Sequence, residues 1–227
     1  GLGDVYKRQT TLSAPQLDRL MGELADHIDL SGCTEYTVEA GRPDTITAEK
    51  LAVLARRGCS RVSVNPQTMQ DAVLERMGRA HRADDILRAY ALARESGIGC
   101  INMDLIAGLP GDSAEGFRAS LEQVLDLGPE NVTVHTLALK KGSRLMEEGG
   151  GLPSGAAVAD MLDFAWAALR GDGQRPYYLY RQKYMSGSFE NVGWCRPGAE
   201  SLYNICMMEE LHTIVSVSYT HLRAHET

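Results

Sequence analysis

Residues 102–110 read Asn102-Met-Asp-Leu-Ile-Ala-Gly-Leu-Pro110, a buried β-strand that passes directly into a tight turn. The strand spans 101–106 and carries the carboxylate of Asp104 near its middle, and glycine and proline then end it. We expect Asp112 to cap the following helix, because Glu115 stands three residues further on. An acid inside a strand is costly to bury unpaired, so Asp104 is either a paired structural acid or a ligand-binding residue.

Strands and helices alternate on both sides of this segment. We expect strands at 37–39, 61–65, 101–106 and 131–139, and helices at 13–28, 47–58, 84–97, from 112 onward, and 158–171. The strands follow one another at the length of a βαβ unit, which predicts a parallel sheet, open or closed into a barrel. A further strand is expected at 176–180, whereas 184–198 matches neither helix nor strand. Residues 151–215 are predicted to form a mixed C-terminal layer on this α/β unit.

The composition describes a globular protein that is not built to bind nucleic acid or to span a membrane. Of 227 residues 44% are hydrophobic, and 23 Lys+Arg face 30 Asp+Glu, for a net charge of −7. A nucleic-acid binder needs a basic face, and a membrane helix needs roughly 18 consecutive apolar residues. Residues 1–9 and 216–227 carry no periodicity, and we expect them to be non-native tails.

The five cysteines argue against a metal site in this chain. They are separated by 26, 41, 95 and 11 positions, so no CxxC, zinc or iron–sulfur spacing occurs; they are Cys33, Cys59, Cys100, Cys195 and Cys206. An odd number of cysteines without a secretory leader indicates reduced thiols, and we therefore expect a cytoplasmic protein.

Polar residues at the ends of the expected strands are the candidate site, because ligands of parallel α/β proteins bind there. They are Glu39, the run 65–67, Asp104 and the run 135–141, with Arg79 following the second strand. His135 fits a core or rim histidine better than a metal ligand, since no second ligand stands at the right spacing.

Three further stretches each have a structural and a functional interpretation. The turn at 108–111 could present backbone N–H groups to an anion or simply shape the chain. The tyrosines of 177–180 could stack a planar ligand or pack within a strand. Lys140, Lys141 and Arg144 could bind carboxylates or lie in a solvated loop.

Four motifs, in their order along the chain, carry a family resemblance. Val38-Glu39-Ala40 with Arg42-Pro43, the run 61–67, Met77-Gly-Arg-Ala-His81 and the run 102–110 resemble the oxygen-independent coproporphyrinogen III oxidase/dehydrogenase family of radical S-adenosylmethionine (SAM) enzymes. The runs 180–187, 190–193 and 203–205 are most similar to the dehydrogenase variant. The resemblance implies an α/β fold, a partial (β/α)6 radical SAM barrel truncated at its N-terminus over 10–150, and a substrate-covering region over 151–215.

The same resemblance implies the chemistry of the site. The SAM-contacting positions of the family fall on Glu39, Gln67, Arg79, Asp104 and Ala138. The implied reaction, in haem biosynthesis, is oxidative decarboxylation of coproporphyrinogen III propionates to protoporphyrinogen IX by a 5′-deoxyadenosyl radical, and it needs a [4Fe–4S] cluster and an electron donor. The cysteine motif CxxxCxxC that holds the cluster is absent, so we expect the chain to be an inactive fragment whose catalytic residues are missing.

Three alternatives remain at this point. Haem chaperones share the barrel motifs, but their Cys-x-His-Asn element corresponds here to Ser201-Leu-Tyr-Asn204, which lacks the cysteine and the histidine. A barrel enzyme of the aldolase type would need a Schiff-base lysine, for which Lys140 and Lys141 are the placed candidates. A purely structural domain explains each motif alone but not their ordered occurrence.

Overall fold

The fold is built on one open sheet, described by the computed structural model for residues 12–137, 151–181 and 189–211. Six strands follow the order β1-β2-β3-β4-β6-β5. The first four pair in parallel, and β6 pairs antiparallel with both β4 and β5. Their bounds are β1 Thr37–Gly41, β2 Arg61–Val64, β3 Cys100–Ala107, β4 Asn131–Thr136, β5 Arg175–Tyr180 and β6 Asn191–Cys195.

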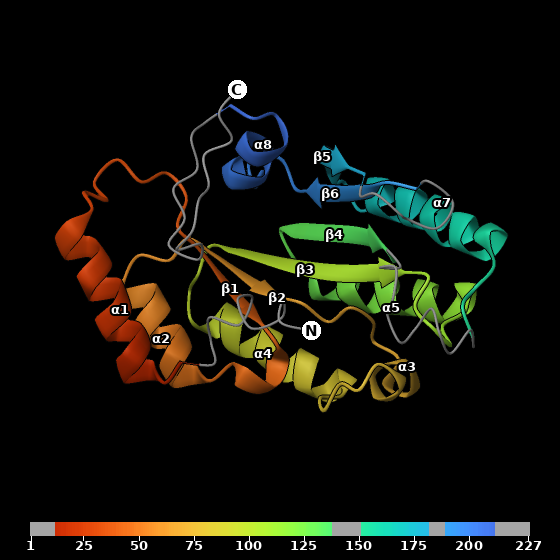
Figure 1. Cartoon of the computed structure of the whole chain (residues 1–227), viewed down its shortest axis with the longest axis horizontal. Helices are drawn as coiled ribbons and strands as arrows, with labels where there is room; N and C mark the ends of the chain where they lie inside the picture. The colour runs from red at the N-terminus through yellow and green to blue at the C-terminus, as the bar shows by residue number, and fades with distance from the viewer. Residues whose placement is uncertain (1–11, 138–150, 182–188, 212–227) are drawn as a thin grey trace, which may run out of the picture.

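Helices cover one side of the strands, and a short C-terminal helix lies across the other (Figure 1). Helix α4 packs on β2, α5 packs on β3, and α7 packs on α5, β3 and β4, whereas α8 contacts β5. The helices are α1 Ala14–His27, α2 Ala48–Arg56, α3 Asp71–Arg76, α4 Ala83–Glu95, α5 Ala114–Leu127, α7 Gly155–Gly171 and α8 Leu202–Met208, with a 3₁₀ turn η3 at Pro43–Thr45.

Alternation along β3 separates the core from the candidate site. Ile101, Met103 and Leu105 are fully buried in the apolar core that the helices share, while the intervening residues are only half-buried. Because successive side chains of a strand point to opposite faces, Asn102 and Asp104 lie on the face away from that core. The period of the sequence thus places the polar residues of the motif on one surface.

The expected α/β class with a partial parallel sheet is confirmed, and the mixed C-terminal layer takes an unexpected form. Among the described residues of 151–211, the strands β5 and β6 extend the parallel sheet beyond β4. Neither β6 nor α8 was expected, and β4 ends at Thr136, earlier than the expected 139. The expected tails, 1–9 and 216–227, lie outside the described residues.

Two helix starts also differ from expectation. The N-cap of α5 is Ser113, whose hydroxyl accepts the N–H of Gly116 at 3.0 Å, and not Asp112, which is buried beside the turn. Helix α4 begins at Ala83, and Asp85 accepts the N–H of Arg82 at 2.8 Å. In each case a side chain near the helix start satisfies a backbone donor that the helix leaves open.

Candidate functional site

A cavity of about 630 Å³ opens on the sheet face away from the helix-covered core. This volume lies within the range of about 300–1,000 Å³ that small-molecule sites occupy. Strand side chains form its floor, and residues of β5, β6 and α8 form one wall. The lining includes Glu39, Asn65, Gln67, Arg79, Asn102, Asp104, Ile106, Thr133, His135, Tyr178, Tyr180, Asn191, Tyr203, Asn204 and Met208.

Strand register arranges this floor in rows. Glu39 stands opposite Ser63, and Ser63 stands opposite Asn102. Two residues further along β3, Asp104 pairs with Thr133 of β4, and two residues beyond that Ile106 pairs with His135. Parallel strands in this register therefore bring polar side chains from four βα units to one surface.

Glu39 is held by hydrogen bonds from the neighbouring strand. The Ser63 hydroxyl donates to Oε1 at 3.1 Å, and the Asn65 amide donates to Oε2 at 3.4 Å. These donors orient the carboxylate at the β1 side of the cavity. The geometry suits a group that receives hydrogen bonds from ligand hydroxyls.

Asp104 is the half-buried acid of the cavity floor. The Asn102 amide donates to its Oδ1 at 2.7 Å, and Nε2 of His135 lies 3.7 Å from its Oδ2. Burial raises the pKa of this carboxyl, but the His135 imidazole and the polar groups of Asn102 and Thr133 outweigh burial and lower it below 3.8. The described partners of Asp104 are thus the His135 imidazole, the Asn102 amide and the Thr133 hydroxyl, and Asp104 lines the cavity.

Gln67 adopts a backbone conformation that few residues with side chains accept. Its φ is +70°, and two backbone hydrogen bonds fix it against β3: Gln67 N–H to the Asp104 carbonyl and Ile106 N–H to the Gln67 carbonyl, both at 2.9 Å. Non-glycine residues in this region cost of order 1 kcal/mol or more and concentrate at functional sites. These two hydrogen bonds hold the chain that follows β2 against β3, at the edge of the cavity.

Arg79 reaches the cavity from the turn after α3. Its N–H donates to the Leu74 carbonyl at 2.9 Å, and Gly78 before it has a φ of +69°. Four of the five expected SAM-contacting residues, Glu39, Gln67, Arg79 and Asp104, thus line one cavity. Ala138, the fifth, lies outside the described residues, although its neighbour Leu137 also lines the cavity.

The wall formed by β5, β6 and α8 holds residues that sequence reasoning did not assign to the site. Tyr178, Tyr180, Asn191, Tyr203 and Met208 line the cavity there. The tyrosine run at 177–180 was the one available signal, because β6 and α8 have no clear periodicity in the sequence. A functional interpretation of those tyrosines needed the antiparallel strands to be known.

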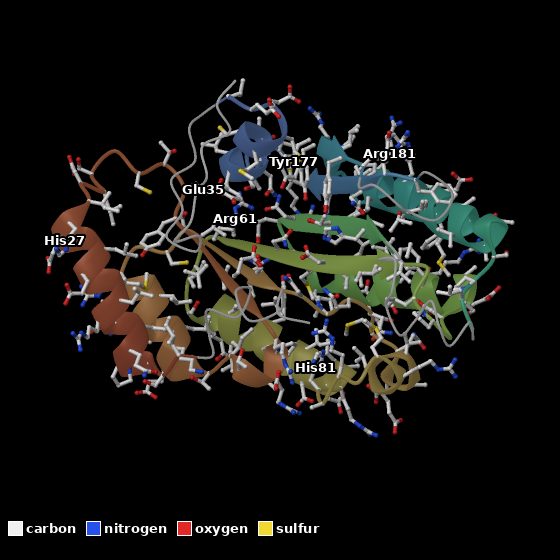
Figure 2. The ribbon with its side chains drawn as sticks, in the orientation of Figure 1. His27, Glu35, Arg61, His81, Tyr177 and Arg181 are labelled. Carbon is white, nitrogen blue, oxygen red and sulfur yellow. The ribbon has the colours of Figure 1, made fainter. Side chains whose placement is uncertain are left out.

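Helix α8, which contacts the edge strand β5, is hydrogen-bonded at its start to Glu35, which lies just before β1 at the other edge of the sheet. This carboxylate accepts the Ser201 hydroxyl at 2.8 Å and the Leu202 N–H at 2.6 Å. Arg61 lies beside it, with Nε 3.7 Å from Glu35 Oε1, and donates from Nη2 to the carbonyl of Ala199 at 2.9 Å. Figure 2 shows Glu35, Arg61 and Tyr177 near this helix, and their hydrogen bonds hold its N-terminal end.

The backbone of the turn at 108–111 is engaged within the fold. The N–H of Gly111, in the turn at 108–111, donates to the Gly151 carbonyl at 2.7 Å, so this amide serves the fold. Lys140, Lys141 and Arg144 lie outside the described residues. His135 stands in the cavity beside Asp104, which makes it a rim residue.

Metal-binding groups are not assembled within 12–137, 151–181 and 189–211. No cluster of three or more His, Cys, Asp or Glu side chains that could hold a metal occurs among these residues, which include all five cysteines. Burial raises the pKa of the Cys59 and Cys100 thiols to about 11, so both are protonated. In the same part of the chain no helix is long and apolar enough to cross a membrane.

The open sheet and its polar cavity define the class of the protein: an α/β protein with a polar cavity on the face of a partly parallel sheet that lies away from the helix-covered core. The family model of the Radical SAM superfamily matches residues 11–124, and the chain belongs to this superfamily. The family implies SAM and a [4Fe–4S] cluster as cofactors. The acids, amides and arginine of the cavity fit SAM, whereas the described cysteines do not fit the cluster.

Similar proteins agree with this assignment. The chain is 43% identical over 211 residues to the oxygen-independent coproporphyrinogen-III oxidase-like protein HemZ of Bacillus subtilis, covering 92% of this chain and 42% of HemZ. It is 31% identical over 201 residues to the heme chaperone HemW of the same organism, covering 86% of this chain and 50% of HemW. The chain therefore spans half or less of the length of these relatives.

The fold has a counterpart among solved structures. Coproporphyrinogen III oxidase (HemN) from Escherichia coli, a radical SAM enzyme, aligns with a TM-score of 0.71 at 24% identity, over 89% of this chain and 44% of that chain. This likeness confirms the expected radical SAM fold.

Proposed function

We propose that this chain forms the SAM-binding, substrate-facing part of a radical SAM oxidoreductase that acts on a porphyrinogen. The observation that carries the proposal is the convergence of Glu39, Gln67, Arg79 and Asp104, which come from separate motifs, on one cavity. Such convergence of polar groups in one cavity is typical of a ligand site.

The chemistry of each side chain suggests its part in holding SAM. The Arg79 guanidinium suits the methionine carboxylate, because arginine recognises carboxylates through paired hydrogen bonds. The carboxylates of Glu39 and Asp104 suit the ribose hydroxyls and the neighbourhood of the positive sulfonium. Backbone at Leu137 and Ala138 would meet the adenine edge. When bound, SAM supplies the adenosyl group on which the radical chemistry of the family depends.

The protein residues in this proposal bind, orient and shield the ligand. The half-buried Asp104 keeps its charge because His135 and Asn102 stabilise it, so it provides a fixed negative charge in a site of reduced polarity. Residues of α8 cover the cavity from the other side and limit access of water. We propose residues 151–215 as the region that covers the substrate.

The substrate proposed for the whole protein is coproporphyrinogen III, decarboxylated oxidatively at its propionates in the cytoplasm with electrons from a separate donor. This step rests on the similarity to HemZ. Because the described residues offer no ligands for a [4Fe–4S] cluster, we propose that the chain binds SAM without cleaving it. Reconstitution with iron and sulfide tests this: we expect no SAM cleavage, and a stable cluster with SAM cleavage would contradict it.

Haem transfer is the second candidate, favoured by the similarity to HemW. Ser201, which stands where the chaperone element would need a cysteine, is the N-cap of α8 and binds Glu35. A haem titration followed by absorbance separates the two functions. A saturable haem complex at equimolar haem would favour the chaperone function, and its absence would favour the oxidoreductase.

Calorimetric titration with SAM tests the proposed site. We expect saturable binding to the chain and its loss in Asp104→Asn and Glu39→Gln, which remove a charge with little change of shape. Asp126→Asn and Glu122→Gln make the same changes on the exposed face of α5 and serve as controls. Equal binding by all four variants would refute the assignment of the site.

A further inference from the structure

The edge strand β5 contains a bulge that faces the cavity. Pro176 pairs with Trp194 and Tyr178 pairs with Gly193, so Tyr177 is an extra residue in β5. Successive side chains of a regular strand point to opposite faces, and a bulge re-aims them. The Tyr177 hydroxyl accepts the Asn204 amide of α8 at 3.0 Å, while Tyr178 lines the cavity. The bulge therefore allows the consecutive residues Tyr177 and Tyr178 to lie on the same side of the sheet.

Gly193 provides the space in which the Tyr178 ring lies. A Cβ at Gly193 would stand 1.9 Å from Cε1 and 2.3 Å from Cδ1 of Tyr178. The glycine sits in regular strand β6, so it is required by the approach of the ring and not by its own backbone conformation. The Tyr177 ring meets the Tyr178 ring edge-on, with centroids 4.9 Å apart, and limits its movement from the other side.

Tyr178 stands in one cross-strand row with the polar residues of the cavity floor: it pairs with Gly193, Gly193 pairs with Thr133, and Thr133 pairs with Asp104. Burial raises the pKa of the Tyr178 phenol well above its ordinary value, electrostatic interaction with Tyr177 and Asp104 adds to the rise, and a side-chain hydrogen bond with Thr133 opposes it. The hydroxyl therefore stays protonated at neutral pH and can donate a hydrogen bond. Packing an aromatic ring over a cross-strand glycine stabilises a sheet by itself, but this packing needs only the ring and not the hydroxyl.

We propose that Tyr178 is a ligand-orienting residue whose hydroxyl donates a hydrogen bond to the molecule bound against Asp104, and that the β5 bulge and Gly193 aim it there. The inference rests on the proposed function, in which that molecule is SAM. It adds to the site a residue from the antiparallel part of the sheet, which lies outside the matched family motifs at 38–110.

Calorimetric titration with SAM of the wild-type chain, Tyr178→Phe and Tyr36→Phe tests this role. Tyr178→Phe keeps the ring and removes the hydroxyl, so we expect SAM affinity to fall about fivefold, the effect of one net hydrogen bond of about 1 kcal/mol. The thermal midpoint should stay unchanged. Tyr36 is half-buried away from the cavity, and its variant should bind SAM as the wild type does.

Gly193→Ala tests the aiming of the ring. We expect it to weaken SAM binding at least as much as Tyr178→Phe and to lower the thermal midpoint, because the new methyl group displaces the ring. In a Tyr178→Ala background the same substitution should leave the midpoint nearly unchanged, since the conflicting ring is gone.

The outcomes separate this inference from the proposed function. If the wild-type chain and Tyr178→Phe bind SAM equally, the ring has a packing role only and the inference is overturned while the SAM site stands. A failure of the wild type itself to bind SAM overturns the proposed function and the inference with it. An equal midpoint loss from Gly193→Ala in both backgrounds would show that Gly193 does not act through Tyr178.

Discussion

Nε2 of His135 lies 3.7 Å from Oδ2 of Asp104, across two adjacent strands of the cavity floor. Asp104 lies on β3, within the motif at 102–110, and His135 lies near the end of the neighbouring strand β4. The His135 imidazole lowers the pKa of Asp104 and so stabilises its charged form against the effect of burial. The proposed ligand site depends on that charge.

Asp104 should titrate below its ordinary value, and His135 should be a main cause. Burial raises the pKa of Asp104 while His135 lowers it, so we expect His135→Leu to move the pKa upward. A ¹³C NMR titration of the Asp104 carboxyl measures the change. His27→Leu, at the exposed end of α1, should leave it unchanged, and an unchanged midpoint in His135→Leu would contradict this account.

The lowered pKa of Asp104 determines how the stability of the protein changes with pH. A carboxyl whose pKa is lower in the folded protein than its value of 3.8 stabilises the fold fully above that value. The contribution is lost as the pH falls through the lowered folded pKa. We therefore expect Asp104→Asn to flatten the acid limb of the stability curve measured by urea denaturation.

Breaking the anchor of α8 should destabilise the fold more than breaking an exposed ion pair. The side chains of Arg61 and Glu35 are 8% and 11% exposed, so Glu35→Gln leaves a buried guanidinium without its partner. We expect a loss of about 3 kcal/mol in the free energy of unfolding. Glu23→Gln breaks the exposed pair with Arg19 and should cost about 0–1 kcal/mol. Similar losses in both variants, measured by urea denaturation, would argue against the anchor.

Ser113 should behave as the cap of α5. Ser113→Ala removes the acceptor for the Gly116 N–H and should cost about 1 kcal/mol of unfolding free energy. Ser31→Ala, at an exposed turn, should change little. Thermal unfolding followed by circular dichroism compares the two, and a neutral Ser113→Ala would return the cap to Asp112.

Asp112 should show the opposite pH behaviour to Asp104. Burial raises its pKa, the Ser113 N–H opposes the rise, and Oδ2 is buried without a hydrogen-bond partner. The folded protein thus holds a proton more tightly than the unfolded chain, and stability falls as the pH rises through the raised folded pKa. We expect Asp112→Asn to stabilise the protein at pH 7, and its advantage to vanish below pH 3.8. A destabilised variant at pH 7 would contradict this interpretation.

Periodicity predicted the parallel half of the fold well because each βα unit forms largely from local signals. The motif at 102–110 placed Asp104 on a strand, and the structure shows that this strand, β3, pairs in parallel with β2 and β4. The antiparallel half could not be predicted in this way. Strand β6 contains Gly193, a residue of low strand preference, and the Tyr178 ring of β5 lies where its side chain would be. Helix α8 depends on Glu35, which lies 166 residues from Ser201.

The residues of the candidate site also differ in how far they could be predicted from the sequence. Glu39, Gln67, Arg79 and Asp104 could be proposed from sequence because they belong to the four motifs that carry the family resemblance. Tyr178 could be listed only as one of several tyrosines, since its direction is set by a bulge that pairing with β6 creates. Asp112 was misassigned as a cap because the choice between it and Ser113 depends on which side chain the tertiary fold buries.

A crystal structure of this chain grown with SAM tests the central claim most directly. We predict SAM density in the cavity between β1–β4 and α8, with the methionine carboxylate at Arg79 and the ribose and sulfonium region at Glu39 and Asp104. SAM bound elsewhere, or density absent at a concentration that saturates binding in solution, would contradict the account.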